Sequence, residues 1–276
     1  MRFLFLISLL LLWIQPAPAP SIVERNFQKH FSQYGLQGSF LLYDEQAARF
    51  TAYDLKRCRQ GFLPASTFKI PNTIIGLETG VIQDTSQIMK WDGQKRSFPQ
   101  WNQDMTLAQA LRVSCVPCYQ QIARGVGAKR YNEKLSNLRF GAMRVTEATV
   151  DSFWLTGSSR ITQFQQIDFL RRLYANQLPA TREHQQTTKA LLELRRTAGY
   201  RLYGKTGWTG RAVGLAAPID NGWFVGWLER TDGRTFYFAL NAEPQPGRTV
   251  ADTKFIPGRR AITEDILAEL QLLSPQ

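Results

Sequence analysis

The stretch Pro64-Ala65-Ser66-Thr67-Phe68-Lys69-Ile70-Pro71-Asn72 decides how the rest of this sequence is interpreted. It predicts the start of a helix that runs to about Thr79 and stops at Gly80. Ser66 and Lys69 form an S-x-x-K pattern, and positions three apart share one side of a helix. A lysine amine that has lost its charge can take the proton from a serine hydroxyl and so make it a nucleophile. Alone, the pattern also fits a capping serine and a solvated lysine.

Two further short motifs strengthen the catalytic interpretation. Ser114-Cys115-Val116 lies at the junction of two helical patterns, just before Pro117. Lys205-Thr206-Gly207 ends a predicted strand. Gly204 and Gly207 flank Lys205, which favours a close backbone approach over a solvated charge on an edge strand.

The order S-x-x-K, S-x-V and K-T-G resembles the serine β-lactamase and penicillin-binding protein superfamily. Longer segments narrow the resemblance to the class D β-lactamases, the oxacillinases, and it extends from about Gly38 to Ile266. Besides residues 64–72, these segments are Trp91-Asp92-Gly93 with Trp101-Asn102-Gln103-Asp104, Phe153-Trp154-Leu155 with Ser159-Arg160-Ile161, Lys205-Thr206-Gly207-Trp208, and Gly222-Trp223-Phe224-Val225-Gly226-Trp227.

The resemblance implies hydrolysis of the β-lactam amide of penicillin-type antibiotics through an acyl-enzyme on Ser66, giving antibiotic resistance. Lys69, N-carboxylated by CO2, would be the general base for acylation and deacylation; no other cofactor and no metal is expected. The modification is physically reasonable, because a lysine in an apolar pocket loses its proton readily. Trp154 would donate its indole N–H to the carbamate, and Phe68 and Val116 would supply dry walls. Without the resemblance, Trp154 also fits plain core packing.

Further roles follow from the same resemblance. Ser114 would pass a proton to the departing lactam nitrogen, and Lys205 would support that transfer. The backbone N–H groups of Ser66 and Trp208 would form the oxyanion hole. The substrate-binding residues would be Thr206, Gly207, Trp208 and Arg259. Thr206 and Arg259 would meet the substrate carboxylate, and the neighbouring Arg260 is a rival that only register disfavours.

The sequence departs from the class D pattern at two places. The family usually has Tyr-Gly-Asn in the helical lobe, whereas the best match here is Phe140-Gly141-Ala142. The tyrosine hydroxyl and the asparagine amide are therefore missing, which puts substrate range and rate in doubt while Phe140 and Gly141 keep the turn shape. Cys115 also stands where the family often has a small alanine.

The order of predicted elements indicates an α+β fold. Strands are expected at 38–43, about 49–53, 201–204, 222–229 and 235–241, and helices at about 106–113, 117–125, 128–138, 162–175, 183–196 and 258–273. This pattern predicts one antiparallel sheet flanked by terminal helices, in three α/β/α-like layers, with an all-helical lobe beside it. The resemblance makes this the serine β-lactamase/penicillin-binding transpeptidase fold, with residues 20–276 as a single domain.

Composition excludes several other kinds of protein. The chain has 276 residues, of which 43% are hydrophobic and 20% charged, as in a folded globular protein. The chain has only two histidines, His30 and His184, which disfavours a His-rich metal site and favours catalysis by serine, lysine, tyrosine or carboxylates. The net charge of +12 is scattered, with no long basic run and no nucleic-acid-binding motif, so we expect no nucleic-acid partner. It suits an anionic small molecule such as a β-lactam.

The N-terminus predicts export. Met1-Arg2 precedes an apolar stretch at 3–14 that is too short to span a bilayer, and small residues follow it. Residues 1–19 are therefore predicted to be a signal peptide cut near 17–19, with a retained anchor as the alternative. We expect a periplasmic protein with no membrane contact after cleavage. Because many relatives of the family dimerise, a homodimer is left as a possibility.

The three cysteines are Cys58, Cys115 and Cys118. The C-x-x-C pair could indicate redox chemistry or half a zinc site, but no second pair and no nearby histidine supports either. We expect Cys115 and Cys118 to be small apolar fillers of a buried helix. A local disulfide is the alternative, although it would strain a regular helix.

Two other functions share the three motifs. One is a D,D-peptidase acting on cell-wall peptides, which the segment around Trp154 disfavours. The other is a β-lactam sensor that is acylated on the same serine and never turns over. A sensor needs a membrane segment and a signalling partner, and the sequence predicts only a cleavable signal.

Overall fold

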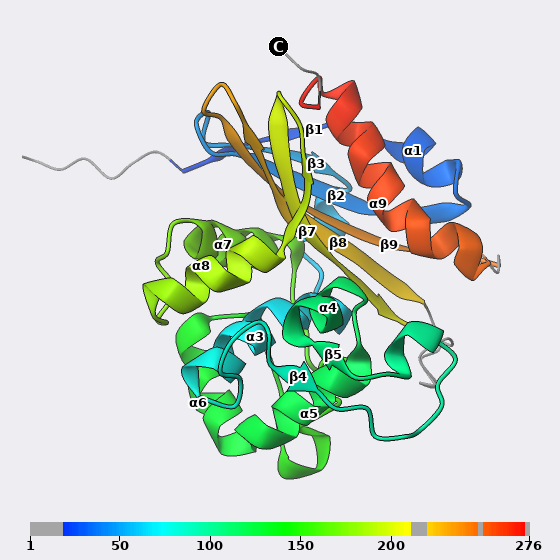
Figure 1. The fold of residues 1–276 in the computed structure, drawn as a ribbon. Coiled ribbons are helices and arrows are strands. Elements are labelled where there is room, and N and C mark those ends of the chain that lie inside the picture. The colour runs from blue at the N-terminus through cyan, green and yellow to red at the C-terminus, as the bar shows by residue number, and fades with distance from the viewer. Residues whose placement is uncertain (1–18, 211–219, 248–250, 274–276) are drawn as a thin grey trace, which may run out of the picture.

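The computed structural model describes residues 19–210, 220–247 and 251–273. Most of the predicted signal peptide, residues 1–18, lies outside the described residues. Figure 1 shows a mixed sheet with helices on both faces and a helical lobe at one end of its long strands. This is the α+β, three-layer arrangement that the sequence predicts.

The bounds of the elements follow in chain order. The strands are β1 (Ser21–Glu24), β2 (Leu36–Asp44), β3 (Arg49–Tyr53), β4 (Ile88–Met89), β5 (Met105–Thr106), β6 (Glu193–Arg196), β7 (Tyr200–Thr209), β8 (Asn221–Arg230) and β9 (Thr235–Pro244). The α-helices are α1 (Gln28–Ser32), α2 (Leu55–Cys58), α3 (Lys69–Glu78), α4 (Leu107–Arg112), α5 (Val116–Val126), α6 (Ala128–Leu138), α7 (Gln163–Tyr174), α8 (Arg182–Leu191) and α9 (Asp252–Glu269). Short 3₁₀ turns are η1 (Ala65–Phe68), η2 (Pro99–Trp101) and η3 (Glu147–Thr149).

The main sheet has the strand order β1-β3-β2-β9-β8-β7-β6. All its neighbouring pairs are antiparallel except β1 with β3, which is parallel. The expected purely antiparallel sheet is therefore wrong at this edge. β1 has only four residues, too few to show an alternating pattern of apolar and polar side chains. Its direction in the sheet could therefore not be inferred from the sequence.

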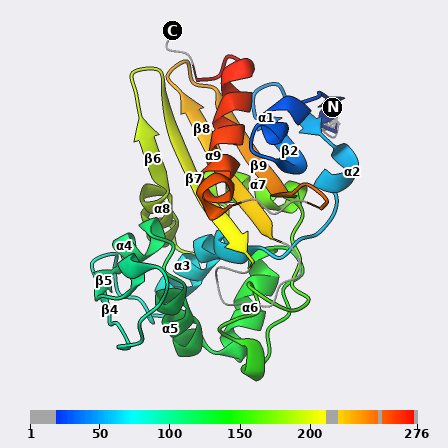
Figure 2. The same ribbon diagram turned by 90° about the vertical axis from the view of Figure 1, so that its right-hand side faces the viewer.

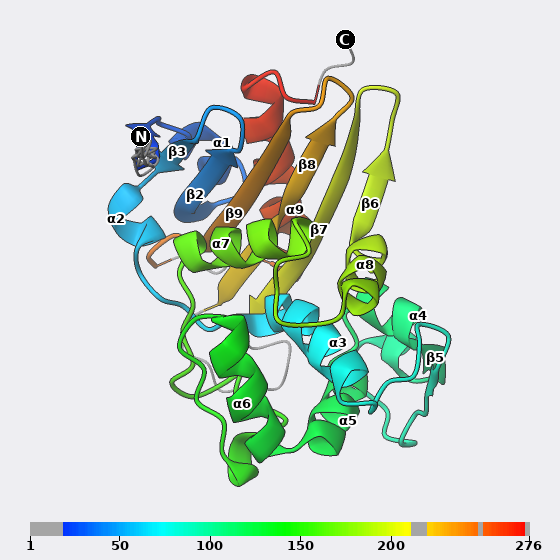
Figure 3. The ribbon, with the colours of Figure 1, turned by 90° about the vertical axis from the view of Figure 1, so that its left-hand side faces the viewer.

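Two hydrophobic cores cover the faces of the sheet. On one face, α1 and α9 pack over a cluster that includes Phe40, Phe238 and Ile262 (Figure 2). On the other face, α7 crosses the sheet and the lobe containing α3, α5 and α6 continues the second core (Figure 3). The alternating side chains of β2, β8 and β9 thus point into two cores, which explains why these strands are buried on both faces.

Two predicted helices have different bounds in the structure. The helix expected at 183–196 ends at Leu191, and Glu193–Arg196 forms the edge strand β6. The helix expected at 258–273 begins already at Asp252 and contains Pro257, so Arg259 lies inside it and does not open it. In both cases tertiary pairing or packing overrides a local signal: β6 pairs with β7, and α9 packs on β8 and β9 with Phe255 buried.

The end of β7 meets η1 beside the helical lobe. A Cβ on Gly207 would lie 3.1 Å from the carbonyl oxygen of Pro64 and 3.2 Å from Cγ2 of Thr67. A Cβ on Gly204 would lie 2.7 Å from the ring of Phe224. The close backbone approach expected from these glycines is confirmed, and it brings the K-T-G motif next to Ser66.

Candidate active site

Ser66 and Lys69 lie on one turn at the start of the central helix of the lobe. Ser66 belongs to η1 and Lys69 is the first residue of α3. Nζ of Lys69 donates a hydrogen bond to Oγ of Ser66 at 2.9 Å. The hydroxyl and the amine therefore meet as the S-x-x-K spacing predicts.

The amine of Lys69 is shielded from water. The residue has 0% exposure, and its pKa lies well below the usual lysine value because burial disfavours the charged form and Lys205 adds a second positive charge. Nζ lies 5.1 Å from the ring centre of Tyr119. A neutral amine beside Ser66 can accept a proton.

An indole N–H lies unused in the same core. Trp154 is fully buried, and its Nε1 has no hydrogen-bond partner among the described residues. Its ring stacks on Phe68 with centroids 5.3 Å apart, and its carbonyl accepts the N–H of Ala65 at 2.9 Å. A buried donor without an acceptor is costly, so this N–H fits an acceptor that the amino-acid side chains do not provide.

Ser114 and Lys205 form a second serine–lysine pair. Nζ of Lys205 donates to Oγ of Ser114 at 2.9 Å and to the carbonyl oxygen of Thr206 at 2.8 Å. Burial, followed by the nearby charge of Arg259, lowers the pKa of Lys205 to about 7. This lysine therefore changes its charge near neutral pH.

The serines of the two pairs line one cavity of about 290 Å³, whereas Lys69 is fully buried behind Ser66 and Lys205 lines a neighbouring cavity. The first cavity holds Ser66, Ser114, Val116 and the substrate-binding residues expected from the sequence. The other lining residues are Phe98, Gln100, Trp101, Arg112, Val113 and Ile256. In the described part of the chain the lining has two arginines and no carboxylate, so the cavity suits an anion.

The structure separates the two candidate arginines. Arg259 is 4% exposed, lines the cavity, and donates to the carbonyl oxygens of Gly207 and Ile256. Burial lowers its pKa to about 10, so it keeps its charge at neutral pH. Arg260 pairs instead with Glu264 at 2.5 Å and lines a neighbouring cavity. The register that favoured Arg259 agrees with this placement.

The segment Phe140-Gly141-Ala142 supports the site from behind. Phe140 is fully buried and packs edge-on against Phe68 and Phe169, with centroids 5.9 and 4.8 Å apart. Gly141 has a φ of +64°, and a Cβ there would lie 2.6 Å from the carbonyl oxygen of Arg160. Phe140 therefore fills the core where the family pattern has a tyrosine, and the glycine preserves the turn.

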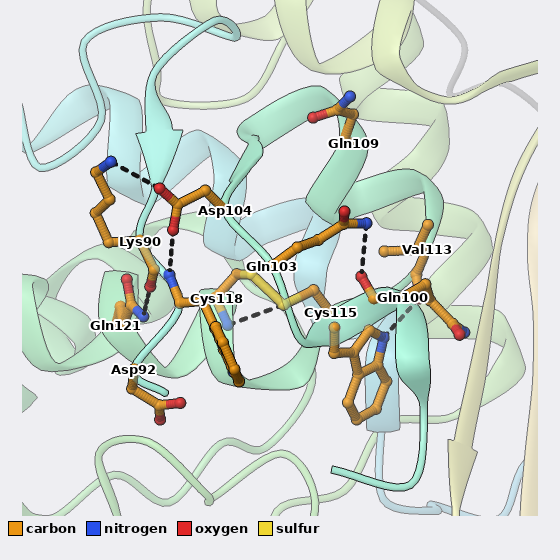
Figure 4. The surroundings of a disulfide bond; sticks show 12 residues. Lys90, Asp92, Gln100, Gln103, Asp104, Gln109, Val113, Cys115, Cys118 and Gln121 are labelled. Carbon is orange, nitrogen blue, oxygen red and sulfur yellow. Dashed lines mark hydrogen bonds and ion pairs between the residues drawn. A yellow bond between two sulfur atoms is a disulfide. The ribbon is translucent and has the colours of Figure 1, made fainter. Parts of the chain in front are cut away.

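The expectation that Cys115 and Cys118 are apolar fillers without a bond is wrong. The two sulfurs form a disulfide, with Cα atoms 5.5 Å apart (Figure 4). Cys115 is the N-cap of α5 with φ −55° and ψ 108°, so it lies outside the regular helix. The strain that argued against a disulfide applies to two positions inside a helix, and that condition is not met here. Cys58 is free and buried.

Sequence reasoning missed several neighbours of the two serines. Tyr119 lies over the Lys69 amine, and its hydroxyl is 2.8 Å from Oγ1 of Thr73. Its position five residues after Ser114, on the same helix as Val116, was a usable signal. Ala65 and Ser114 have left-handed backbones, with φ of +51° and +56°. The residue types did not predict these backbone conformations, because alanine and serine rarely adopt the left-handed region.

The chain was compared with known families and proteins. It matches the family described as penicillin binding protein transpeptidase domain over residues 26–263. It is 39% identical over 252 residues to β-lactamase OXA-10 of Pseudomonas aeruginosa, which covers 91% of this chain and 93% of that protein. The class D β-lactamase YbXI from Nostoc superposes with a TM-score of 0.82 at 38% identity, covering 90% of this chain and 99% of the other. The C-terminal domain of the Bacillus licheniformis BlaR penicillin-receptor superposes with a TM-score of 0.82 at 25% identity, covering 93% and 99%.

Proposed function

Since this chain belongs to the class D β-lactamases, which are serine enzymes, we propose that it opens penicillin-type β-lactams through an ester on Ser66, with the N-carboxylated Lys69 as general base. One observation carries the proposal: Nζ of Lys69, fully buried, lies 2.9 Å from Oγ of Ser66.

The surroundings of Lys69 fit a carbamate. Carboxylation needs a neutral amine, and burial together with Lys205 lowers the pKa of Lys69 well below its usual value, which favours that form. The resulting anion needs donors, and Nε1 of Trp154 lies buried without an acceptor among the described residues. Phe68, buried and stacked on Trp154, and Val116, which lines the cavity, would supply apolar walls. When present, the carbamate supplies a base that accepts a proton at neutral pH.

In acylation, Ser66 loses its proton to Lys69 and its Oγ forms a bond to the lactam carbonyl carbon. The N–H groups of Ser66 and Trp208 stabilise the negative charge on the carbonyl oxygen. The C–N bond of the ring then breaks, and the nitrogen takes a proton through Ser114, whose hydroxyl Lys205 holds at 2.9 Å. The proton that reaches the nitrogen is the one that Lys69 took from Ser66, so Lys69 is again free to act as a base. In deacylation, Lys69 takes a proton from water as the water oxygen bonds to the ester carbon, and it returns that proton to Oγ of Ser66 as the C–O bond of the ester breaks.

The substrate carboxylate would be bound by the residues of β7 and α9 that line the cavity. Thr206 and Gly207 lie in the last part of β7, which runs to Thr209, and Arg259 on α9 donates to the carbonyl oxygen of Gly207. Arg259 stays charged at neutral pH, because a pKa of about 10 lies well above it. A positive charge with no competing carboxylate among the described lining residues orients the lactam carbonyl toward Ser66.

We further propose that the protein works in the periplasm and confers antibiotic resistance. The predicted signal peptide at 1–19 supports export. None of the helices in the described part of the chain is both long and apolar enough to cross a bilayer. The test is growth on penicillin of a bacterial host that exports the protein to its periplasm. The intact gene should allow growth, and the Ser66→Ala variant should not.

A β-lactam sensor is the alternative, because the BlaR receptor domain superposes as well as the class D enzyme does. The two functions differ only after acylation: a sensor keeps its ester, whereas a hydrolase loses it. Purified residues 20–276 are mixed with benzylpenicillin, and product formation is followed together with the intact mass of the protein. Repeated turnover supports the hydrolase; a stoichiometric adduct that persists supports a sensor or a D,D-peptidase.

A further inference from the structure

Ser114 occupies a strained position between two helices. α4 ends at Arg112 and α5 begins at Val116, so only three residues connect them. Ser114 has a φ of +56°, a region that residues with a side chain rarely adopt. Such conformations persist only where the surrounding structure holds them from several sides.

The α4 side of this junction is held by hydrogen bonds. The N–H of Ser114 donates to the carbonyl oxygen of Leu111 at 3.2 Å, and that of Cys115 donates to Ala110 at 2.8 Å. Nε1 of Trp101 donates to the carbonyl oxygen of Val113 at 3.0 Å. These bonds fix the backbone that leads into Ser114. They do not fix the backbone between Cys115 and the first turn of α5.

The α5 side is held by the disulfide. Cys115 immediately follows Ser114, and its sulfur is bonded to Cys118 in the first turn of α5 (Figure 4). The same sulfur accepts the N–H of Cys118 at 3.2 Å. The closed loop contains Val116, which lines the active-site cavity. Both cysteines are buried, at 0% and 5% exposure.

We propose that the Cys115–Cys118 disulfide is a positioning element of the active site, which holds Ser114 Oγ against Lys205 Nζ for proton transfer during acylation. This inference rests on the proposed function, because it assigns the bond to one step of that reaction. A bridge across so few residues closes only a short loop, so it contributes less to the free energy of unfolding than a bridge across a long loop would, and the atoms that it constrains lie at the junction itself. Its effect is therefore local.

The test uses a variant that removes the bond and refills its volume, Cys115→Ala/Cys118→Val. Stopped-flow measurements with nitrocefin give the acylation rate constant and the burst amplitude, which counts competent sites. We expect an acylation rate constant about 10-fold lower at full burst amplitude. An unchanged rate constant overturns the proposal, and so does a reduced amplitude with an unchanged rate constant, because that result is loss of folded protein only. Cys58→Ala, which removes the buried free thiol, is the matched control and should leave both unchanged.

A double-mutant cycle tests whether the bond acts through Ser114. Ser114→Gly removes the hydroxyl and accepts a positive φ without strain. In that background, removal of the disulfide should cause less than a twofold further loss of acylation rate, because the group that it positions is gone. The same 10-fold loss in both backgrounds would place the effect elsewhere and overturn the proposal.

Hydrogen exchange separates this proposal from the proposed function, because it needs no substrate. In the disulfide-free variant the amides of Ser114 and Cys115 should exchange about 10-fold faster, while those of α6 stay unchanged. Equal exchange in both proteins contradicts the positioning role even if the enzyme is active. Absence of any acyl-enzyme in the wild type contradicts the proposed function even if exchange behaves as expected.

Discussion

The turn that carries Ser66 and Lys69 and the junction that carries Ser114 both place a serine 2.9 Å from a lysine amine. They are built in different ways. Ser66 and Lys69 are three residues apart on one helical turn, whereas Ser114 and Lys205 are 91 residues apart and meet across the cleft. The first pair depends on local geometry, and the second on the packing of the lobe against the sheet.

The two lysines also differ in their surroundings. Lys69 is fully buried, lies over Tyr119 and has no counter-charge within the described residues. Lys205 bonds to Ser114 and a backbone carbonyl and is next to the cavity. The comparison teaches that one spacing between hydroxyl and amine can serve two tasks: a base where the amine is dry and neutral, and a proton donor where its charge is available.

The largest difference between the pairs should appear when each serine is removed. Ser66→Ala should abolish the covalent adduct and lower kcat by about 10⁵-fold or more, because it deletes the nucleophile. Ser114→Ala should slow acylation by about 10²-fold, because only proton transfer is impaired. Intact mass after incubation with benzylpenicillin gives both results. An adduct on the Ser66→Ala protein would remove Ser66 as nucleophile.

Lys69→Ala should slow deacylation by about 10³-fold, so that an acyl-enzyme accumulates. Added bicarbonate should not rescue it, because the amine that takes up CO2 is gone. Lys205→Ala is the matched change in the second pair, and it should mainly slow acylation. The two rate constants, measured in one stopped-flow series, distinguish these effects. If Lys69→Ala still deacylates at the wild-type rate, the base is another group.

The pH dependence of kcat/KM should reveal Lys205. Its pKa is about 7, lowered by burial and by Arg259, and Lys69 faces it from α3. Lys205 is thus charged below about pH 7 and neutral above it, so kcat/KM should fall as pH rises through this value. Lys205→Arg should move that fall to higher pH while lowering the maximum by about 10-fold. An unmoved alkaline limb would mean that another group produces it.

Trp154→Phe should have the smallest effect of these substitutions when bicarbonate is abundant. The ring that stacks on Phe68 is largely kept, and only the buried N–H is lost. Without this donor the carbamate is less stable, so activity should drop by about 10-fold in CO2-depleted buffer and recover with bicarbonate. The loss should also deepen on acidification, because protonation of Lys69 competes with carboxylation. Equal bicarbonate dependence in variant and wild type would separate Trp154 from Lys69.

The same comparison explains how much could be predicted from the sequence. The turn with Ser66 and Lys69 follows from helical periodicity, and α6, expected at 128–138, has those bounds in the structure. The motifs at Ser114 and Lys205 were visible, but their contact required the resemblance to a family, because spacing says nothing about residues 91 apart. The end of α8 at Leu191 was missed because the following strand is defined by pairing with β7.

The disulfide was missed for a different physical reason. The expected helices at 106–113 and 117–125 left Cys115 between them, but the spacing of the two cysteines was interpreted as one face of a buried helix. In the structure Cys115 is the N-cap, just after a left-handed Ser114. Element boundaries are set by backbone angles that single residues do not reveal, so the correct relation between the two cysteines needed coordinates.

The most direct measurement compares the two lysines in one sample. The protein is equilibrated with ¹³C-bicarbonate, and its carbamate carbons are counted by ¹³C NMR in the wild type, Lys69→Ala and Lys205→Ala. A dry, neutral amine only at position 69 predicts one resonance in the wild type and in Lys205→Ala, and none in Lys69→Ala. A wild-type spectrum without a carbamate resonance, or one that survives Lys69→Ala, would contradict the assignment of the base.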